Sequence, residues 1–516
     1  MTVKSIRVRT IAVITVMVLV VLFIFWQYPI KKGNEHTSAA GGGRTFQMGK
    51  LLAGKFCASC HMLPDPGLLP KAVWSGSVLP IMGLYLGTTP HDKQPDIELA
   101  GKSYKPFPEQ PMMSPEEWAA LTNYYVSSAP EKLPAMETEK PDLGKLPFDV
   151  VMPQQEELSS TAAVASYSKI ESGQLFVNDG VKNVLHVFDA GLKPLTYIKT
   201  KGPVVDILFE RERILTCIIG AELTANDLKN GSVISVKKPI STGTNLTLQP
   251  MFDKLARPLQ VLAADINKDG KTDYVLAEFG NLTGKLSWME NLGHERFKKH
   301  VIREVPGAIK VIINDEDRDG FPEIYALFAQ ADEGIFKFKN TGNGTFETIR
   351  MLHFPPSYGS SNFDLVDFNR DGKLDILYTC GDNADYSPVL KPYHGLYIYL
   401  NTDHNEFKQR FFYAINGCYK ALARDFDGDG DLDIAAISFF PATAKPWEAF
   451  TYLQNNGDFK FKAFGLPENT SFQKGITMDA GDLNGDGKID LVLGNGYFAT
   501  AADAKKQPLF IYLKHK

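Results

Sequence analysis

The chain has 516 residues, 44% of them hydrophobic and 22% charged, which is the balance of a soluble globular protein and more than one ordinary domain. Its formal net charge of −5, without a long basic block, gives no reason to expect a nucleic-acid partner. No P-loop, G-x-S-x-G or dinucleotide-binding fingerprint occurs, so the common local motifs of hydrolases and nucleotide-binding enzymes are absent.

The N-terminus predicts export. Lys4, Arg7 and Arg9 precede an uncharged run over residues 10–30, whose apolar centre is intermediate between a signal peptide and a membrane span. Residues 27–32, which follow this run, lack a small-x-small cleavage site. This favours an uncleaved membrane anchor over residues 1–32, and cleavage near Ser38 is the alternative. Residues 33–44, with three consecutive glycines, are expected to form a flexible linker.

A C-x-x-C-H motif follows, made by Cys57, Cys60 and His61. Two thiols at this spacing can bond covalently to one haem, and the adjacent histidine can then ligate the iron. A dithiol redox pair or half of a zinc site would also use two cysteines, but the chain has no second C-x-x-C. The preceding run, residues 45–56, lacks proline and predicts a helix that delivers the motif to the cofactor.

The sixth iron ligand is expected to be a methionine, because a thioether suits an electron carrier. Met82, Met112 and Met113 are the candidates, whereas Met62 lies too close to His61 to reach the opposite face of a haem. A final helix is predicted from Ser114 to Ser128, opened by a capping box with Glu117. The sequence thus predicts a small all-α haem domain over residues 45–130 and a proline-rich linker over residues 131–147.

Five acidic loops of the pattern D-x-[DN]-x-D-G-x-x-[DE] recur in the second half, 50 to 58 residues apart. Side-chain oxygens at positions 1, 3, 5 and 9, with a glycine at position 6, suit a hard cation such as Ca²⁺. About five calcium ions are therefore expected. The predicted ligands are Asp265, Asn267, Asp269, Asp273, Asp315, Asp317, Asp319, Glu323, Asp367, Asn369, Asp371, Asp375, Asp425, Asp427, Asp429, Asp433, Asp482, Asn484, Asp486 and Asp490.

The loops are not EF-hands, because position 12 is never the bidentate glutamate of that motif and a strand-like run follows each loop. A repeat of this length with about four strands is typical of a β-propeller. Residues 148–516 are therefore predicted to form an all-β propeller of about seven blades, two of them without an acidic loop. A strand over residues 148–152 is expected to close the ring against the last blade.

These repeats resemble FG-GAP/VCBS units of integrin-α-like propellers, and the whole arrangement resembles envelope proteins in which a c-type cytochrome domain precedes such a propeller. The resemblance depends on the C-x-x-C-H motif, the five acidic loops and the segment from Val78 to Gly87. Because the resembling proteins keep a methionine in that segment, the resemblance favours Met82 over Met112 and Met113 as iron ligand.

Three cysteines remain outside the haem motif: Cys217, Cys380 and Cys418. Cys380 and Cys418 fall at equivalent ends of strands in consecutive blades, which predicts a disulfide on one face of the propeller. Two separate buried thiols are the alternative reading.

Three functions compete on sequence alone. The first is electron transfer by one haem c, with the propeller docking a redox partner protein, a polysaccharide or another ligand on the periplasmic side of the inner membrane. The second is an oxidoreductase whose propeller holds an active site that passes electrons to the cytochrome. The third is a calcium-dependent adhesion module. We favour the first, because cation binding accounts for the repeated polar residues of the propeller and leaves no catalytic residues over.

Overall fold

The computed structural model describes residues 39–95, 97–99, 102–104, 107–238, 250–384, 388–403, 406–498 and 505–516. The chain divides into two compact units, Met1–Gln47 and Met48–Lys516, and the first contributes only the start of one helix to the described residues. The predicted anchor, residues 1–32, lies outside the described residues. Within the described part of the chain, no helix has the length and apolar character needed to cross a membrane.

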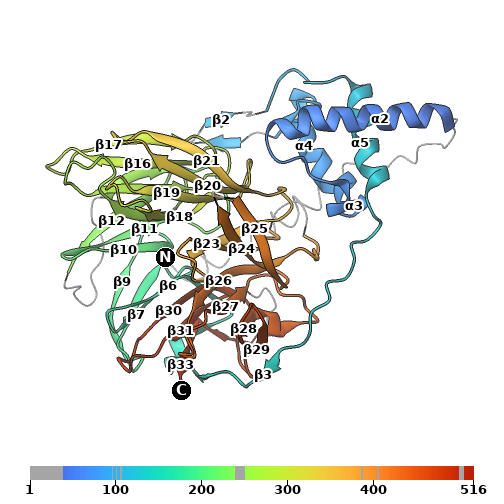
Figure 1. The fold of residues 1–516 in the computed structure, drawn as a ribbon. Helices are drawn as coiled ribbons and strands as arrows, with labels where there is room; N and C mark the ends of the chain where they lie inside the picture. Colours follow the sequence, from blue (N-terminus) through green and yellow to red (C-terminus); the bar gives the residue numbers. More distant parts are fainter. Residues whose placement is uncertain are drawn as a thin grey trace, which may run out of the picture. The chain divides into compact units, whose positions relative to one another are not determined.

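The first part of the chain is mainly helical (Figure 1). Its helices are α2 (Ala39–Phe56), α3 (Lys71–Val73), a π-helical turn (Trp74–Val78), α4 (Leu79–Tyr85) and α5 (Pro115–Ser128), with short 3₁₀ turns at Cys57–Ser59, Pro66–Leu68 and His91–Lys93 and a hairpin of β1 (Ile97–Leu99) and β2 (Lys102–Tyr104). The predicted helix before the haem motif is confirmed. It begins earlier than expected, since α2 also includes the three consecutive glycines of the predicted linker. A glycine costs a helix only about 1 kcal/mol relative to alanine, so these residues can join the helix.

Helix α5 begins as the sequence predicts. The Ser114 hydroxyl accepts a hydrogen bond from the Glu117 N–H at 3.2 Å, and the Glu117 carboxylate accepts one from the Ser114 N–H at 2.8 Å. The helix then crosses α2 at Gly49, where a side-chain Cβ would lie only 2.1 Å from the carbonyl oxygen of Ala120. Glycine therefore sets how closely these two helices approach each other.

The strands of residues 148–516 form seven four-stranded groups among the described residues. In chain order, six of them are β6 (Ala162–Glu171), β7 (Gln174–Asp179), β8 (Val184–Phe188) and β9 (Pro194–Lys199); β10 (Val204–Phe209), β11 (Arg213–Ile218), β12 (Gly231–Lys237) and β13 (Pro250–Leu255); β14 (Pro258–Ala264), β15 (Asp273–Glu278), β16 (Lys285–Asn291) and β17 (Phe297–Arg303); β18 (Ala308–Asn314), β19 (Glu323–Phe328), β20 (Gly334–Asn340) and β21 (Phe346–His353); β22 (Ser360–Val366), β23 (Asp375–Cys380), β24 (Gly395–Asp403) and β25 (Glu406–Ala414); and β26 (Cys418–Arg424), β27 (Asp433–Ser438), β28 (Phe450–Asn455) and β29 (Phe461–Gly465). The seventh group combines β30 (Gly475–Gly481), β31 (Asp490–Phe498), β33 (Phe510–His515) and β4 (Phe148–Val151).

These groups are the blades of a closed propeller (Figure 1). The first strand of each blade contacts the first strand of the next, in the order β6, β10, β14, β18, β22, β26, β30 and back to β6. The last blade is completed by β4, which pairs antiparallel with β33, so the two ends of the β-rich region meet in one sheet. Both the estimate of seven blades and the predicted closing strand agree with this arrangement.

Three short strands join the ring from outside the regular pattern. β3 (Asp142–Leu143) adds a parallel strand to β29, and β5 (Ser159–Ser160) pairs with β32 (Gln507–Pro508). Two 3₁₀ turns, Glu156–Leu158 and Pro446–Ala449, lie in the connections.

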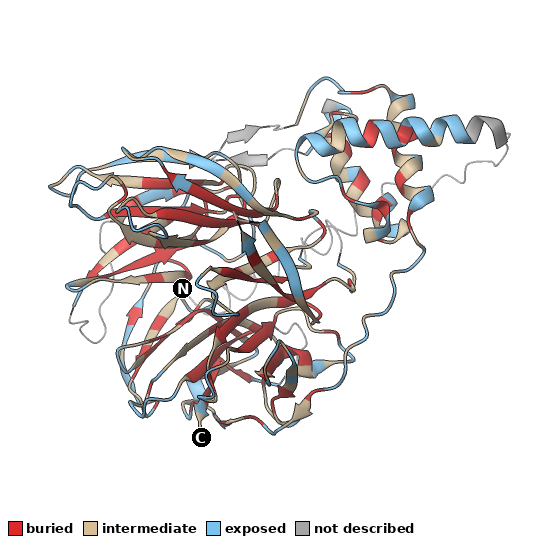
Figure 2. Ribbon diagram, in the orientation of Figure 1, coloured by how far each residue is buried: buried red, intermediate tan, exposed pale blue. Residues whose placement is uncertain are grey.

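The core of the propeller lies between neighbouring blades, and Figure 2 shows the buried residues concentrated in the strands. In every blade with an acidic loop, the six residues that begin the second strand are all buried. Such strands are covered on both faces, which explains why their sequences are nearly continuous apolar runs rather than alternating ones. The five strands predicted after the acidic loops are confirmed.

The predicted disulfide between Cys380 and Cys418 is wrong. Both cysteines are free and fully buried. Cys380 packs in the apolar cluster with Tyr325 of the preceding blade, and its thiol donates to the carbonyl oxygen of Tyr393 at 3.3 Å. Cys418 belongs to the cluster on the other face of the same blade, with Leu377. The two side chains therefore occupy different interblade layers, which the spacing of the cysteines could not reveal.

Candidate functional site

The C-x-x-C-H motif begins where α2 ends. Cys57 opens the 3₁₀ turn Cys57–Ser59, and the Ser59 hydroxyl donates to the Phe56 carbonyl oxygen at 2.6 Å. Cys57 is half-buried at the edge of the helical core, whereas Cys60 is exposed. The helix end therefore presents one thiol toward the apolar interior and the other toward solvent.

The ring of His61 is oriented by a hydrogen bond. Its Nδ1 lies 2.9 Å from the carbonyl oxygen of Met62, and because a carbonyl can only accept, Nδ1 carries the proton. The lone pair of the neutral ring is then on Nε2, the atom that would ligate a metal. The histidine of the motif is thus held in the tautomer that an axial iron ligand requires.

Tyr125 of α5 fixes the segment that follows the motif, a role for which the sequence carries no local signature. Its hydroxyl donates to the Pro64 carbonyl oxygen at 3.2 Å and is also within hydrogen-bonding reach of the Cys57 thiol. Burial is the main cause that raises the pKa of Cys57. Trp74, whose ring lies 4.5 Å from that of Tyr125, donates from Nε1 to Pro66 at 2.8 Å. Together these contacts tie the motif loop to the last helix.

The three candidate methionines differ in their surroundings. Met82 is partly exposed on α4, directly after the π-helical turn, a feature that recurs at functional sites. Met112 is 50% exposed, and Met113 is 5% exposed and packed in the helical core. Met113 therefore already has the environment of a core residue, while Met82 and Met112 have side chains that remain available.

The helical part also exposes an unusual amount of apolar surface. Six of the 13 large hydrophobic side chains that are exposed in the described chain fall between residues 48 and 112: Met48, Leu51, Met62, Leu63, Tyr85 and Met112. Leu51 is 75% exposed. Exposed apolar side chains of this kind can be covered by an apolar cofactor. The two thiols, the free Nε2 and these side chains are compatible with a covalently bound haem.

The five acidic loops all lie in the same place of the blade, between its first and second strands. The loops therefore share one face of the ring, since the first strands of a propeller run in the same direction. Their backbones also agree: position 6 is a glycine with positive φ in all five, and position 4 has positive φ as well, at Lys268, Arg318, Arg370, Gly428 and Gly485. Position 4 is a lysine, an arginine or a glycine in different loops, so the sequence did not indicate this shared backbone conformation.

The carboxylate at position 1 holds each loop closed. It accepts a hydrogen bond from the glycine N–H at position 6, at 2.8 Å between Asp265 and Gly270 and at 3.0 Å between Asp315 and Gly320. The other three loops repeat this bond at 2.8 to 3.0 Å. The side chain at position 3 accepts from the N–H of position 5 in all five loops.

The carboxylate at position 9 is buried and ties the loop to the blade. Asp433 accepts from the Asn455 N–H at 2.8 Å and from the Tyr452 hydroxyl at 2.7 Å. Burial raises the pKa of Asp433 to about 6, and it also raises the pKa of Asp375. At position 5, by contrast, a backbone N–H holds the pKa of Asp371 below its usual range. Each loop thus combines outer side chains that solvent reaches with one buried carboxylate at position 9.

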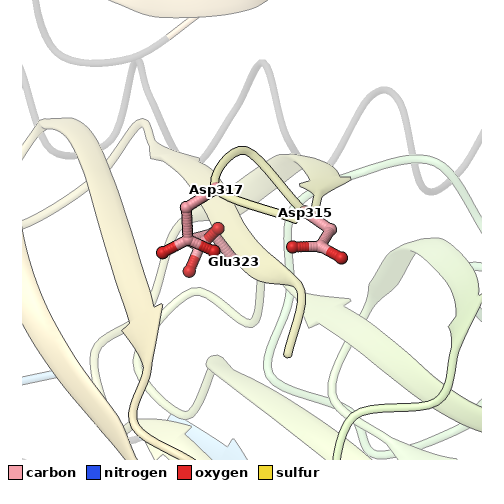
Figure 3. A group of neighbouring side chains, drawn as sticks. All are labelled: Asp315, Asp317 and Glu323. Atoms are coloured by element: carbon pink, nitrogen blue, oxygen red, sulfur yellow. The ribbon is translucent and has the colours of Figure 1, made fainter. Parts of the chain in front are cut away.

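Two of the five loops bring three carboxylates together. Ligand oxygens of Asp315, Asp317 and Glu323 lie within 4.8 Å of one another. Figure 3 shows these three side chains at the turn between β18 and β19. The carboxylates of the fourth loop, Asp425, Asp427 and Asp429, are gathered in the same way. These are the two loops with aspartate at position 3, where the others have asparagine. Oxygen ligands at this separation suit Ca²⁺.

Comparison with known proteins supports the propeller part of the chain. The family model described as an FG-GAP-like repeat matches residues 315–378 and 425–493, which contain four of the five acidic loops and the strands between them, β19–β22 and β27–β30. Cartilage acidic protein 1 of Mus musculus is 26% identical over 197 residues, and that of Xenopus tropicalis is 25% identical over 224 residues. These matches cover 36% and 40% of this chain but only 28% and 30% of the relatives' own length.

Solved structures with a similar chain path share little sequence. A catalytically inactive virginiamycin B lyase from Staphylococcus aureus, crystallised with quinupristin, has a TM-score of 0.43 and 12% identity, covering 71% of this chain and 99% of its own. Saccharomyces cerevisiae Sqt1 has a TM-score of 0.42 and 7% identity, covering 73% and 99%. The strand pairing described above, rather than these distant similarities, identifies the propeller.

Proposed function

We propose that this protein is a haem-binding electron-transfer protein of the cell envelope, in which a calcium-stabilised propeller docks a partner or ligand. The orientation of His61, with Nε2 free beside two cysteines at a helix end, is the observation that carries the proposal. The exposed apolar side chains of residues 48–112 support it, because a bound haem would cover part of that surface.

In this proposal each residue of the motif has a separate task. Cys57 and Cys60 would hold one haem c, and His61 and Met82 would bind its iron, with Met112 or Met113 as the alternative to Met82. Haem bound in this way supplies one-electron transfer. Tyr125 holds the segment after the motif against α5, and the Met62 carbonyl orients the His61 ring.

Calcium in the acidic loops has a structural task. Up to five Ca²⁺ would neutralise carboxylates that the fold holds close together, including one buried carboxylate in each loop. The loops lie on one face of the ring, so metal loading would change both the rigidity and the charge of that face. We assign the docking of a redox partner protein or a polysaccharide to the propeller.

Covalent haem attachment also implies a location. The chain would be exported by residues 1–32 and held by them in the inner membrane, with the haem and propeller on the periplasmic side. The charge pattern of the N-terminus and the C-x-x-C-H motif support this placement together, since haem is joined to thiols outside the cytoplasm.

The test is electron exchange by the full chain, made together with a cytochrome c maturation system. The purified protein should be reduced and reoxidised by small soluble electron carriers in a single one-electron step, and Cys57→Ser with Cys60→Ser should abolish the response. Reduction of the haem by sugars, alcohols or aldehydes without any carrier would contradict the carrier role and support the oxidoreductase alternative instead.

A further inference from the structure

The five acidic loops differ at position 7, the residue whose carbonyl oxygen is the backbone ligand in loops of this kind. In the three loops with asparagine at position 3, position 7 is a lysine: Lys271, Lys373 and Lys488. In the two loops with aspartate at position 3, position 7 is Phe321 or Asp431. The two loops with the additional carboxylate therefore lack the positive charge that the other three carry at this position.

In the first and third loops, the lysine at position 7 faces the carboxylate at position 5 of its own loop. Nζ of Lys271 lies 2.7 Å from Oδ2 of Asp269, and Nζ of Lys373 lies 3.9 Å from Oδ2 of Asp371. Both pairs are partly exposed, so neither adds much to the stability of the fold. They nevertheless place a positive charge beside the outer carboxylates of each loop.

In the second loop, the positive charge comes from the loop of the preceding blade. Lys268, at position 4 of the first loop, reaches across to the second loop, where its Nζ donates to the carbonyl oxygen of Asp319 at 2.5 Å. The same ammonium group lies 4.8 Å from the centre of the Phe321 ring. The aromatic residue at position 7 therefore contacts a cation that the neighbouring blade supplies.

The fourth loop repeats this arrangement with different side chains. Arg370, at position 4 of the third loop, donates to the carbonyl oxygen of Gly430 in the fourth loop. Its Nη2 also lies 3.2 Å from Oδ1 of Asp431 at position 7. In both loops with aspartate at position 3, a basic side chain from the preceding loop thus contacts the residue at position 7.

The glycines at position 6 show which loops a neighbouring side chain crosses. A Cβ on Gly320 would lie only 2.6 Å from Nζ of Lys268. One on Gly430 would lie 3.4 Å from Nη2 of Arg370. For the corresponding glycines of the other three loops, no atom of the described chain beyond their immediate neighbours lies within 4 Å of such a Cβ: Gly270, Gly372 and Gly487. The crossing is therefore confined to the two loops with four carboxylates.

We propose that Lys268 and Arg370 are positioning residues that hold the acidic loop of the next blade closed when no metal is bound, and that their positive charge competes with calcium there. The inference rests on the calcium role proposed above. Four carboxylates in one loop repel each other unless a cation lies nearby, and a divalent ion in the loop would repel the basic side chain in turn. The calcium affinity of the second and fourth loops is thus lowered by a residue of the preceding blade.

Hydrogen exchange of the full chain in chelator, followed by mass spectrometry of the loop peptides, tests the first part of the proposal. Lys268→Met should speed exchange in residues 315–323 by about twofold to fivefold, the range expected when one exposed charged contact is lost, and leave residues 425–433 unchanged. Arg370→Met should do the reverse. Arg318→Met is the matched control: Arg318 is exposed at position 4 of the second loop, and no side chain crosses Gly372 in the third. This variant should leave residues 367–375 unchanged.

A calcium titration with the same readout separates this inference from the calcium role itself. In Lys268→Met, protection of residues 315–323 should reach half its maximum at a calcium concentration about twofold to fivefold lower than in the wild type, because the competing charge is gone. Unchanged exchange in chelator, or a half-maximum at the same or a higher concentration, would overturn the inference and leave the calcium role intact. A wild type in which calcium protects none of the loops would overturn both.

Discussion

Replacing Asp317 by asparagine separates the cost of crowded carboxylates from their use as metal ligands. Asp317 occupies position 3 of the second acidic loop, where three of the other loops have asparagine. Its Oδ1 accepts from the Asp319 N–H at 3.2 Å, and Asn267 makes the same bond at 3.2 Å in the first loop. Asp317→Asn therefore keeps the loop geometry and removes one negative charge.

The size of the effect follows from the distances. Ligand oxygens of Asp315, Asp317 and Glu323 lie within 4.8 Å of one another, so Asp317 takes part in two repulsive pairs. Two charges about 4 Å apart interact by about 1 kcal/mol in bulk water and by about 4 kcal/mol at a dielectric constant of 20. Because Asp317 is exposed, we take the lower value for each pair, which gives about 2 kcal/mol in all. Without calcium, Asp317→Asn should raise the free energy of unfolding by that amount.

Chemical unfolding of the wild type and the variant, with chelator and with saturating calcium, measures both effects. Calcium should stabilise the variant less than the wild type, and the affinity of the loop should fall about tenfold, since ligand charge tunes calcium binding. The reverse swap, Asn267→Asp, should act in the opposite direction and is the matched control. A variant that is less stable in chelator, with an unchanged response to calcium, would refute the reasoning.

Three further predictions concern the helices and one buried histidine. Gly49→Ala should destabilise the helical part by about 1–3 kcal/mol through the forced separation of α2 and α5, whereas Gly54→Ala, with nothing within 4 Å of its Cβ, should be neutral or stabilising in thermal unfolding. Met82→Ala should abolish the thioether-to-ferric-iron absorption band, while Met113→Ala should keep the band and cost about 2–4 kcal/mol, as a buried side chain does. Burial lowers the pKa of His394 to about 3, so the unfolded state binds more protons below its own pKa of about 6.5. The free energy of unfolding should therefore decrease as the pH is lowered below about 6.5, and this group should account for about 2 kcal/mol of that loss at pH 5. His394→Gln should make the free energy of unfolding depend less steeply on pH, and an unchanged pH dependence would contradict the assignment.

The parts of the fold that the sequence predicts are those with a local signature. The capping box of Ser114 and Glu117 needs only residues three apart, and the acidic loops mark the first two strands of five blades. The two blades without such loops were expected from the length of chain left for them and from strand-like runs within it, although such runs alone do not locate a blade boundary. The closing of the ring by β4 was expected from its position before the first blade, and its pairing with β33 bears this out.

The features that escaped prediction depend on tertiary arrangement. Cys380 and Cys418 can form a disulfide only if their side chains lie in the same interblade layer, and the structure places them in different layers. The number of residues between two strands of different blades does not determine which layer each side chain enters. The hydrogen bond of Tyr125 to Pro64 joins segments 61 residues apart.

Mass spectrometry of the intact and digested protein, made with a cytochrome c maturation system, tests the central claim most directly. We predict that one haem remains bound after denaturation and that it maps to the peptide containing Cys57 and Cys60. A protein that is fully haem-free after denaturation, with both thiols open to alkylation, would contradict the covalent site and with it the proposed electron-transfer function.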